Sequence, residues 1–305
     1  MKNRWLKGNT HTHTTYSDGD SPPEVVVDWY AEHGYDFVFL TDHNVVVPDD
    51  HMRQLQRREL LVWPGEEITM GLVHVNGLGI RETIPLPTEQ VALDQTGFPM
   101  TPSVLIRWAS DRVTAQQGLS SINHPNLYRG LNATDVMGIS GARLLEIGNM
   151  SSASSKVNSG NDSRPSTEHV WDALLASQQR IWAVASDDAH HFKNWGPAWS
   201  NPGRGWVMIE AEPDLHACLA ALDEGRFYAS TGPELSEYRA GDDEIIVELA
   251  TSGASIELIG PGYQVLDSCQ GVQARFSRLP KAPYLRVRVC DANGGRLWTQ
   301  PYFLS

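Results

Sequence analysis

Histidines and carboxylates recur in this chain at spacings that could gather them around metal ions. His11 and His13 form a His-x-His pair directly after an expected first strand. Residues two apart on an extended chain point to the same side, so both imidazoles could reach one ion. One such pair is weak evidence by itself, because unrelated histidines also fall at this spacing.

The combination of a buried strand with a metal-capable side chain at its end recurs along the chain. Four further apolar runs end in this way: Phe37–Leu40 before Asp42 and His43, Leu60–Trp63 before Glu66 and Glu67, Leu119–Ile122 before His124, and Ile181–Val184 before Asp187, Asp188, His190 and His191. His74 lies inside another apolar run. Separate surface and core histidines are the alternative, but they leave the repeated position at strand ends unexplained. Mixed imidazole and carboxylate ligands suit zinc, manganese or iron, and not a structural thiolate zinc site.

The elements that must position these groups alternate between short apolar strands and helices. Helices are expected from Ser21, as the N-cap, to His33, from Thr101 to just before Gly118, from Ser166 to Gln178, and from Pro213 to Glu224. Such alternation predicts an α/β fold with a mostly parallel sheet covered by helices. A doubly wound sheet is the alternative, but metal-capable groups at several strand ends favour a barrel, whose mouth would gather them.

The pattern of the sequence changes after Gly232. Apolar and polar residues then alternate in four segments separated by Gly, Pro and Asp turns: Glu244–Leu249, Ala254–Ile259, Gln273–Phe276 and Tyr284–Val289. This alternation predicts an antiparallel sheet or a small sandwich with one solvent-facing side. We therefore expect a metallohydrolase barrel over residues 1–232 and a small all-β domain over residues 233–305.

Taken in order, these motifs resemble the polymerase and histidinol phosphatase (PHP) superfamily. The matching strings cover roughly residues 8–230: His11-Thr12-His13, Ser17-Asp18-Gly19, Thr41-Asp42-His43, Gly65-Glu66-Glu67-Ile68, His74, Asn123-His124-Pro125, Glu146-Ile147-Gly148-Asn149 and Asp188-Ala189-His190. Each string is short, whereas the ordered set is specific. The resemblance implies a distorted (β/α)7 TIM-like barrel, the PHP fold, which holds two or three divalent metal ions (zinc, manganese or iron).

The resemblance also implies a role for each metal ligand. The first metal would be held by His11, His13, Glu67 and Asp188, the second by Glu67, His74 and His124, and the third by Asp18, His43 and His190. Glu67 would bridge the first two ions. The doubled pairs Glu66-Glu67 and Asp187-Asp188 leave a one-residue ambiguity, which we resolve in favour of Glu67 and Asp188. Asp187 would then support the metal ligands without binding metal itself, and Asp42 would orient a ligand rather than bind metal.

The expected chemistry is hydrolysis of a small phosphorylated molecule, with nucleotides among the candidates, by a metal-dependent phosphoesterase. A metal-bridging hydroxide at Glu67 would attack phosphorus directly, without a covalent enzyme intermediate. His191 or Asp187 would protonate the leaving group. This hypothesis makes Glu67, Asp187 and His191 the catalytic residues.

Substrate contacts are expected from the loops that follow the strands. Arg129 and Arg164 lie in two such loops and are the predicted phosphate-binding residues, because phosphate recognition needs cations near the metals. Lys193 and Arg204 follow His190, where each alone would more commonly be a solvated surface charge. Trp195 and Trp199 lie in the same loop and could line the pocket, whereas most other aromatic residues are expected in the core.

Three other functions stay open. The stretch Gly225–Pro233, followed by a strand-rich tail, resembles the branch that includes carbaryl-type ester hydrolases. That resemblance favours a metallohydrolase of a carbamate or carboxylic ester as the main alternative. A non-catalytic metal-binding module would be expected to lose ligands, and here the set is complete. Nuclease proofreading is disfavoured by the acidic charge, although short oligonucleotides stay open as substrates.

Composition sets the remaining expectations. The chain of 305 residues carries 37 acidic and 24 basic residues, a formal charge of −13, which opposes binding of long nucleic acids. The sequence contains no apolar stretch of signal-peptide or membrane-helix length, so we expect no membrane contact. Three scattered cysteines suggest neither a zinc site nor a disulfide framework and favour a reducing, cytoplasmic location. A homo-oligomer is left open.

Overall fold

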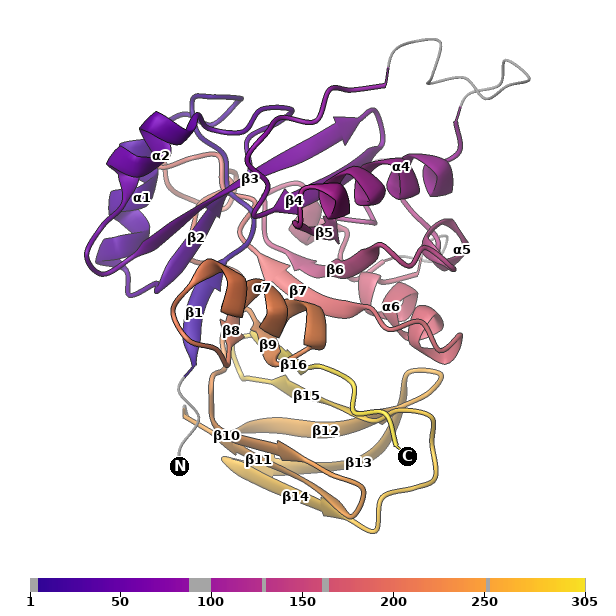
Figure 1. The fold of residues 1–305 in the computed structure, drawn as a ribbon. Helices are drawn as coiled ribbons and strands as arrows, with labels where there is room; N and C mark the ends of the chain where they lie inside the picture. The colour runs from indigo at the N-terminus through magenta and orange to yellow at the C-terminus, as the bar shows by residue number, and fades with distance from the viewer. Residues whose placement is uncertain (1–4, 88–99, 128–129, 161–164, 251–252, 305) are drawn as a thin grey trace.

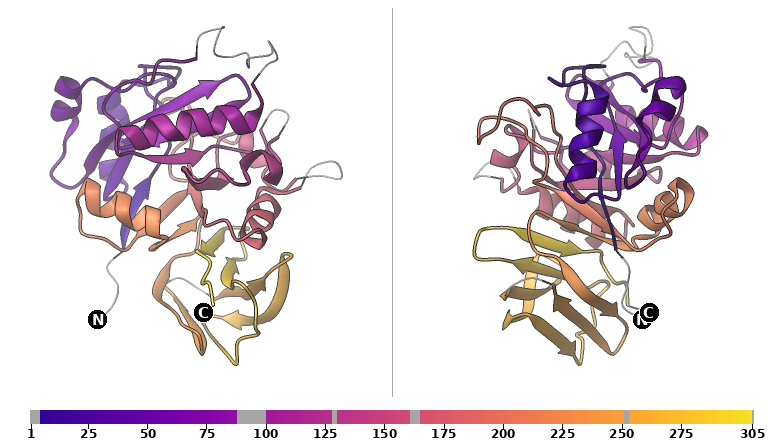
Figure 2. Two further views of the ribbon diagram at one scale, coloured as in Figure 1. Left: turned by 45° about the vertical axis from the view of Figure 1, so that its right-hand side comes forward. Right: turned by 90° about the vertical axis from the view of Figure 1, so that its left-hand side faces the viewer.

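The computed structural model describes residues 5–87, 100–127, 130–160, 165–250 and 253–304. In Figure 1 a curved sheet with helices packed on it forms the upper part of the molecule, and layers of strands form the lower part. The two further views of Figure 2 show the same separation. The prediction of an α/β fold with an additional all-β region is confirmed.

Seven strands of the α/β part follow one another in the sheet in chain order. They are β1 (Leu6–Asn9), β2 (Phe37–Leu40), β3 (Leu61–Met70), β4 (Val73–Leu78), β5 (Leu119–Ile122), β6 (Ala142–Asn149) and β7 (Trp182–Ser186). The pairs β1–β2, β2–β3, β5–β6 and β6–β7 are parallel, whereas β4 is antiparallel to both of its neighbours. Four of these six pairings are parallel, in agreement with the predicted mostly parallel sheet, and both exceptions involve β4. Strands β3 and β4 form a hairpin that turns at Gly71, whose φ of +66° favours glycine.

Helices pack against this sheet, and some of them have a capping side chain at the N-terminus. They are α1 (Pro23–Glu32), α2 (Asp49–Leu55), α4 (Pro102–Ala115), α5 (Ala133–Val136), the 3-10 helix η1 (Ser154–Lys156), α6 (Thr167–Ala176) and α7 (Leu215–Glu224). Ser166 caps α6 by accepting a hydrogen bond from the His169 amide. Pro22, and not the predicted Ser21, occupies the N-cap of α1, and Ser21 donates its hydroxyl to Asp20 instead. No helix within the described ranges is long and apolar enough to cross a membrane.

The sheet continues from the α/β part into the C-terminal strands. Beyond β1 lie β8, β9, β16, β15, β12 and β13, in that order, and all of these pairings are antiparallel. These strands are β8 (Trp206–Ile209), β9 (Phe227–Ser230), β12 (Ala254–Gly260), β13 (Gln264–Gly271), β15 (Arg286–Cys290) and β16 (Arg296–Thr299). The division of the chain at residue 232 stays a prediction, because one sheet runs across that position.

A second, three-stranded sheet packs on the C-terminal strands. It consists of β10 (Leu235–Ala240), β11 (Glu244–Leu249) and β14 (Gln273–Ser277), with β11 in the middle. Along β11 the side chains of Ile245 and Val247 are buried and those between them are not, as period-two alternation requires. These buried side chains share one hydrophobic cluster with Ile256 and Val289 of the large sheet. Of the two arrangements expected, an antiparallel sheet or a small sandwich, the structure shows the sandwich, with β11 and β14 each burying one face in its core.

The C-terminal segment also contacts β7, which ends the pairing order of the large sheet. The side-chain amide of Gln300 donates to the carbonyl of Ala183 and accepts from its amide, both at 2.8 Å. Gln300 thus pairs with β7 as the backbone of a neighbouring strand would. An isolated parallel bridge joins Thr12 to Ala189 beyond the strand ends. Closure of the sheet into a complete barrel stays a prediction.

A buried ion pair connects the all-β region to α6. Glu168, in the first turn of α6, lies 2.7 Å from Nη1 of Arg286 on β15, and their side chains are 4% and 0% exposed. The guanidinium carbon of Arg286 lies 4.7 Å from the centre of the Trp171 ring. Its Nε and Nη2 meet no hydrogen-bond partner within the described part of the chain. Glu168 therefore provides the main compensation for a fully buried positive charge.

Candidate metal centre

The first group of candidate ligands forms beyond the ends of β1 and β7, next to Glu67 within β3. His11 Nε2 and His13 Nε2 lie 3.1 Å apart, and each is 3.3 Å from Oε2 of Glu67. Oδ1 of Asp188 lies 3.3 Å from His11 Nε2 and 3.2 Å from His13 Nε2. All four residues are buried, and each offers one donor atom within 4.8 Å of the others. The structure therefore brings together the four residues predicted for the first metal.

Glu67 joins this group to a second one. Its Oε1 lies 3.0 Å from Nδ1 of His74 and 3.1 Å from Nε2 of His124. Its Oε2, which faces His11 and His13, also lies 3.0 Å from Nδ1 of His43. One carboxylate thus contacts both groups, the arrangement expected of a ligand that bridges two ions.

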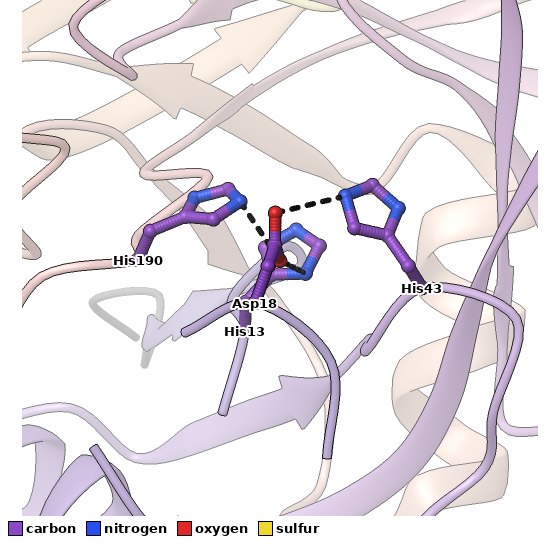
Figure 3. A group of neighbouring side chains, drawn as sticks. All are labelled: His13, Asp18, His43 and His190. Atoms are coloured by element: carbon purple, nitrogen blue, oxygen red, sulfur yellow. Dashed lines mark ion pairs between the residues drawn. The ribbon is translucent and has the colours of Figure 1, made fainter. Parts of the chain in front are cut away.

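A third group lies at the more exposed side of the cluster and is drawn in Figure 3. There the carboxylate of Asp18 faces three imidazoles, those of His13, His43 and His190. Its oxygens lie 3.6 Å from His13 Nδ1, 3.7 Å from His43 Nε2 and 3.4 Å from His190 Nε2. The Asp18 side chain is 57% exposed, whereas Glu67 and Asp188 are buried. Solvent therefore reaches the cluster from the side of Asp18.

The charges of the buried groups depend on one another. Burial opposes a charge on His11, but the carboxylates of Asp188, Glu67 and Glu146 outweigh it and raise the pKa of His11 well above its ordinary value. Burial likewise opposes ionisation of Glu67, yet the surrounding imidazoles hold its pKa well below its ordinary value. For His190, the Asp18 and Asp188 carboxylates overcome burial and raise its pKa to about 9. The carboxylates thus stabilise positive charge in this cluster.

The cluster fits divalent cations better than it fits a network of protons. Oε2 of Glu67 is buried and meets no donor in hydrogen-bond geometry among the described residues, although three imidazole nitrogens surround it. His11 and His13 point Nε2 atoms at each other, so at most one neutral ring can donate across that contact. Cations bound between these atoms would satisfy the oxygen and both nitrogens at once.

Glu146 supports the first group, a role that the sequence did not reveal. On β6, its Oε1 lies 2.7 Å from His11 Nδ1 and accepts from Ser186 Oγ at 2.6 Å. Its Oε2 accepts from the His124 amide at 2.8 Å and from Asn149 Nδ2 at 2.9 Å. A carboxylate at Nδ1 leaves Nε2 of His11 free to act as a ligand. Two signals were available, a charged residue inside the buried run Leu144–Ile147 and the string Glu146-Ile147-Gly148-Asn149, but neither gave Glu146 a role.

We expect Glu146→Gln to weaken metal binding without unfolding the protein. All four partners of Glu146 donate or can donate to it, so the NH2 group of glutamine would face donors wherever it points. Loss of such a supporting carboxylate typically costs roughly 10–100-fold in metal affinity. Competition with a chromophoric chelator measures the change, and thermal unfolding serves as the folding control. Unchanged affinity in the folded variant would show that Glu146 does not orient His11.

Two further carboxylates, Asp42 and Glu66, were not expected to bind metal. Asp42 points away from the cluster and accepts from Thr14 Oγ1 at 2.9 Å and from Ser17 Oγ at 2.8 Å, so it holds the loop that carries Asp18. Glu66 lies on the opposite face of β3 from Glu67 and accepts from the Ile84 amide at 2.9 Å. Burial raises the pKa of Glu66 to about 7. Neither residue belongs to the groups of candidate ligands.

The two predicted proton donors differ in their surroundings. Asp187 is fully buried, and it accepts from the Tyr30 hydroxyl at 2.8 Å and from the amides of Arg204 at 2.6 Å and Gly205 at 2.9 Å. His191 is partly exposed, and its Nδ1 accepts from the Ser200 amide at 3.3 Å. Asp187 thus holds the loop that follows β7, whereas no hydrogen bond to Nε2 of His191 is made by the residues that the structure describes.

Two of the candidate ligands sit in a backbone conformation that side chains rarely adopt. His124 has a φ of +26° and Asp188 a φ of +48°. Conformations of this kind cost energy and concentrate at functional sites. They follow β5 and β7 directly, so the strained turn places each side chain over the end of the sheet.

The predicted substrate-binding arginines lie outside the described residues. Arg129 and Arg164 both fall in ranges that the structure does not describe, so their phosphate-binding role stays a prediction. Of the other cations considered, Lys193 donates to the carbonyl of Asp20. Arg204 donates to the carbonyls of Trp199 and Gly196, both at 2.9 Å. These two side chains support the loop after His190.

Comparisons with known proteins bear on the fold. No family model matches the sequence, and no curated protein matches it. Among solved structures, the chain is similar to a two-domain protein from Bacteroides vulgatus that contains a predicted PHP-like metal-dependent phosphoesterase. Its TM-score is 0.52 at 16% identity, and the match covers 99% of this chain and 95% of that one. The fold is therefore that of PHP-like proteins, which confirms the resemblance drawn from the motifs at the level of the fold.

Two further structures match only part of the chain. One is a candidate metal-dependent phosphoesterase from Bifidobacterium adolescentis, with a TM-score of 0.43 at 15% identity, covering 64% of this chain and 89% of its own. The other is an amidohydrolase from Chromobacterium violaceum with bound sulfate and no metal, with a TM-score of 0.41 at 14% identity, covering 64% and 93%.

Proposed function

We propose that this protein is a metal-dependent phosphoesterase that hydrolyses a small phosphorylated molecule. The observation that carries the proposal is the continuous cluster of imidazoles and carboxylates in which Glu67 contacts two groups of histidines. Two or three divalent cations, zinc, manganese or iron, are the ions that this donor set suits. The fold shared with a PHP-like phosphoesterase supports the same class of reaction.

The residues of the chain then divide into three ligand sets. We assign His11, His13, Glu67 and Asp188 to one cation, Glu67, His74 and His124 to a second, and Asp18, His43 and His190 to a third. His43 also lies close to Glu67 and His74, and His13 lies close to Asp18, so these two rings lie between neighbouring sets. Bound cations of this kind lower the pKa of water and neutralise charge on phosphoryl oxygens. Glu146 and Asp42 orient the ligands, and Arg129 and Arg164 are the proposed phosphate-binding residues.

We assign proton donation to His191 rather than to Asp187. His191 is partly exposed, and its imidazolium form can give a proton to a leaving oxygen and return to the neutral ring. His191 directly follows His190 of the third group, which places its ring beside the cluster. Asp187 instead accepts three hydrogen bonds that hold the loop after β7.

The test is a substrate panel on protein loaded in turn with zinc, manganese and iron. We expect turnover of phosphate monoesters that stops when a chelator removes the metal and returns when metal is added back. Phosphate diesters, carbamates and carboxylic esters complete the panel. Turnover of carbamates or carboxylic esters alone would replace this proposal with the ester-hydrolase alternative, and bound metal without any turnover would favour a binding module.

A further inference from the structure

The loop that follows His190 is held in one shape by an internal hydrogen-bond network. Arg204 donates to Asn201 Oδ1 at 2.9 Å as well as to the carbonyls of Trp199 and Gly196. Asn201 in turn donates to the carbonyl of His191 at 2.8 Å. The amides of His190 and His191 both donate to the carbonyl of Ser200, at 2.9 and 3.0 Å. A loop bonded in this way presents its side chains in fixed positions.

This fixed loop exposes two indole rings. The side chain of Trp199 is 38% exposed and that of Trp195 is 55% exposed. Burial of an indole stabilises a fold, so a rigid loop that leaves two of them at the surface suggests a role in recognition. Arg204 is directed at carbonyls of the loop and Lys193 at the carbonyl of Asp20, so these two cations are engaged with the backbone while the indoles are exposed.

The two indoles differ in their relation to the metal centre. The Trp199 ring lies 4.7 Å from the ring of His191, which lies 6.3 Å from that of His190. His190 stacks on His13 at 4.0 Å, so an unbroken series of rings runs from the candidate ligands to Trp199. Trp195 lies instead 6.0 Å from Trp29 of α1. Trp199 is therefore the indole beside the centre, and Trp195 lies toward the outer helices.

We propose that Trp199 binds an aromatic ring in the substrate, so that the natural substrate is a phosphate ester whose leaving group carries an aromatic ring. This inference rests on the proposed function and narrows its substrate class. A planar group leaving phosphorus near the third ligand group would lie against the His191 and Trp199 rings. Contact with an indole face favours aromatic over aliphatic groups, because stacked and edge-to-face ring pairs add to the burial of apolar area.

The experiment compares the variants Trp199→Ala, Trp199→Phe and Trp195→Ala in metal-loaded protein. Each is assayed with phenyl phosphate and with ethyl phosphate, and its affinity for phenylphosphonate and ethylphosphonate is measured by calorimetry. We expect wild-type protein to prefer the phenyl compound of each pair. Trp199→Ala should reduce that preference about tenfold, the effect of one aromatic contact. Trp199→Phe should keep most of it, and Trp195→Ala should leave it unchanged.

Several outcomes would overturn the inference. They are a wild-type protein without phenyl preference, a Trp199→Ala variant that keeps the full preference, and equal losses on phenyl and ethyl compounds, which would indicate a structural role. An equal effect of Trp195→Ala would also overturn it. Absence of turnover on either phosphate would contradict the proposed function, and the phosphonate affinities would still decide whether Trp199 selects the aromatic group.

Discussion

Glu67→Gln should remove most of the bound metal and the hydrolytic activity that depends on it. Glu67 contacts His11 and His13 through one carboxylate oxygen and His74 and His124 through the other. Glutamine keeps the shape but loses the charge and one of the two oxygens, so it cannot bridge two cations. We therefore expect a loss beyond the roughly 10–100-fold typical of residues that only orient a ligand.

A matched control lies one residue away. Glu66 occupies the opposite face of β3, is also buried, and bonds the Ile84 amide. Because burial already raises its pKa to about 7, Glu66→Gln resembles its protonated form and should leave metal content near that of the wild type. Elemental analysis after dialysis, together with turnover, measures both variants. Full metal content in Glu67→Gln, or an equal loss in Glu66→Gln, would refute the assignment of Glu67 as the bridge.

The second large effect concerns stability rather than chemistry. Glu168→Ala removes the main partner of Arg286, which is fully buried and whose Nε and Nη2 meet no hydrogen-bond acceptor among the described residues. Removing one partner of a buried ion pair leaves the other charge buried without compensation, which lowers the free energy of unfolding by roughly 3–5 kcal/mol. Urea unfolding followed by tryptophan fluorescence measures that loss through the transition midpoint.

The double variant Glu168→Leu with Arg286→Met distinguishes charge from packing. It removes both charges and keeps apolar volume, so we expect much of the lost stability to return. The single variants Glu168→Leu and Arg286→Met are measured alongside it. If the loss of unfolding free energy in the double variant equals the sum of the two single losses, the residues act independently and the buried ion pair does not explain the effect. The metal content of these variants should match that of the wild type, since neither residue belongs to the candidate ligand groups.

Much of the site could be predicted because most of its candidate ligands lie in short motifs next to recognisable strands. A His-x-His pair after β1, a histidine after β2 and an Asp-Ala-His sequence after β7 each combine a recognisable strand with a polar residue at its end. The carboxyl ends of parallel strands lie at the same edge of a sheet, so the clustering of these groups followed from the predicted fold. The one-residue choice of Glu67 over Glu66 agrees with the alternation of side chains along β3.

The rest depended on contacts between residues far apart in the chain. Glu146 belongs to one of the motif strings, but its role beside His11 could not be predicted because the two residues lie 135 positions apart in the chain. The reversal at β4 follows from a two-residue hairpin, for which a leucine beside Gly71 gave little sign. The continuous sheet across residue 232 arises because β16 returns to β9, and no local pattern encodes which strand edge a later strand will join.

The contacts of β16 and Gln300 have a consequence for the order in which the protein can be made. During synthesis, residues 182–186 leave the ribosome more than a hundred residues before Gln300, the side chain that pairs with Ala183. Until then the edge of β7 lacks this partner and the edge of β9 lacks β16, and exposed strand edges invite pairing with other chains. We therefore expect the nascent chain to be most prone to intermolecular strand pairing between the synthesis of β7 and that of β16.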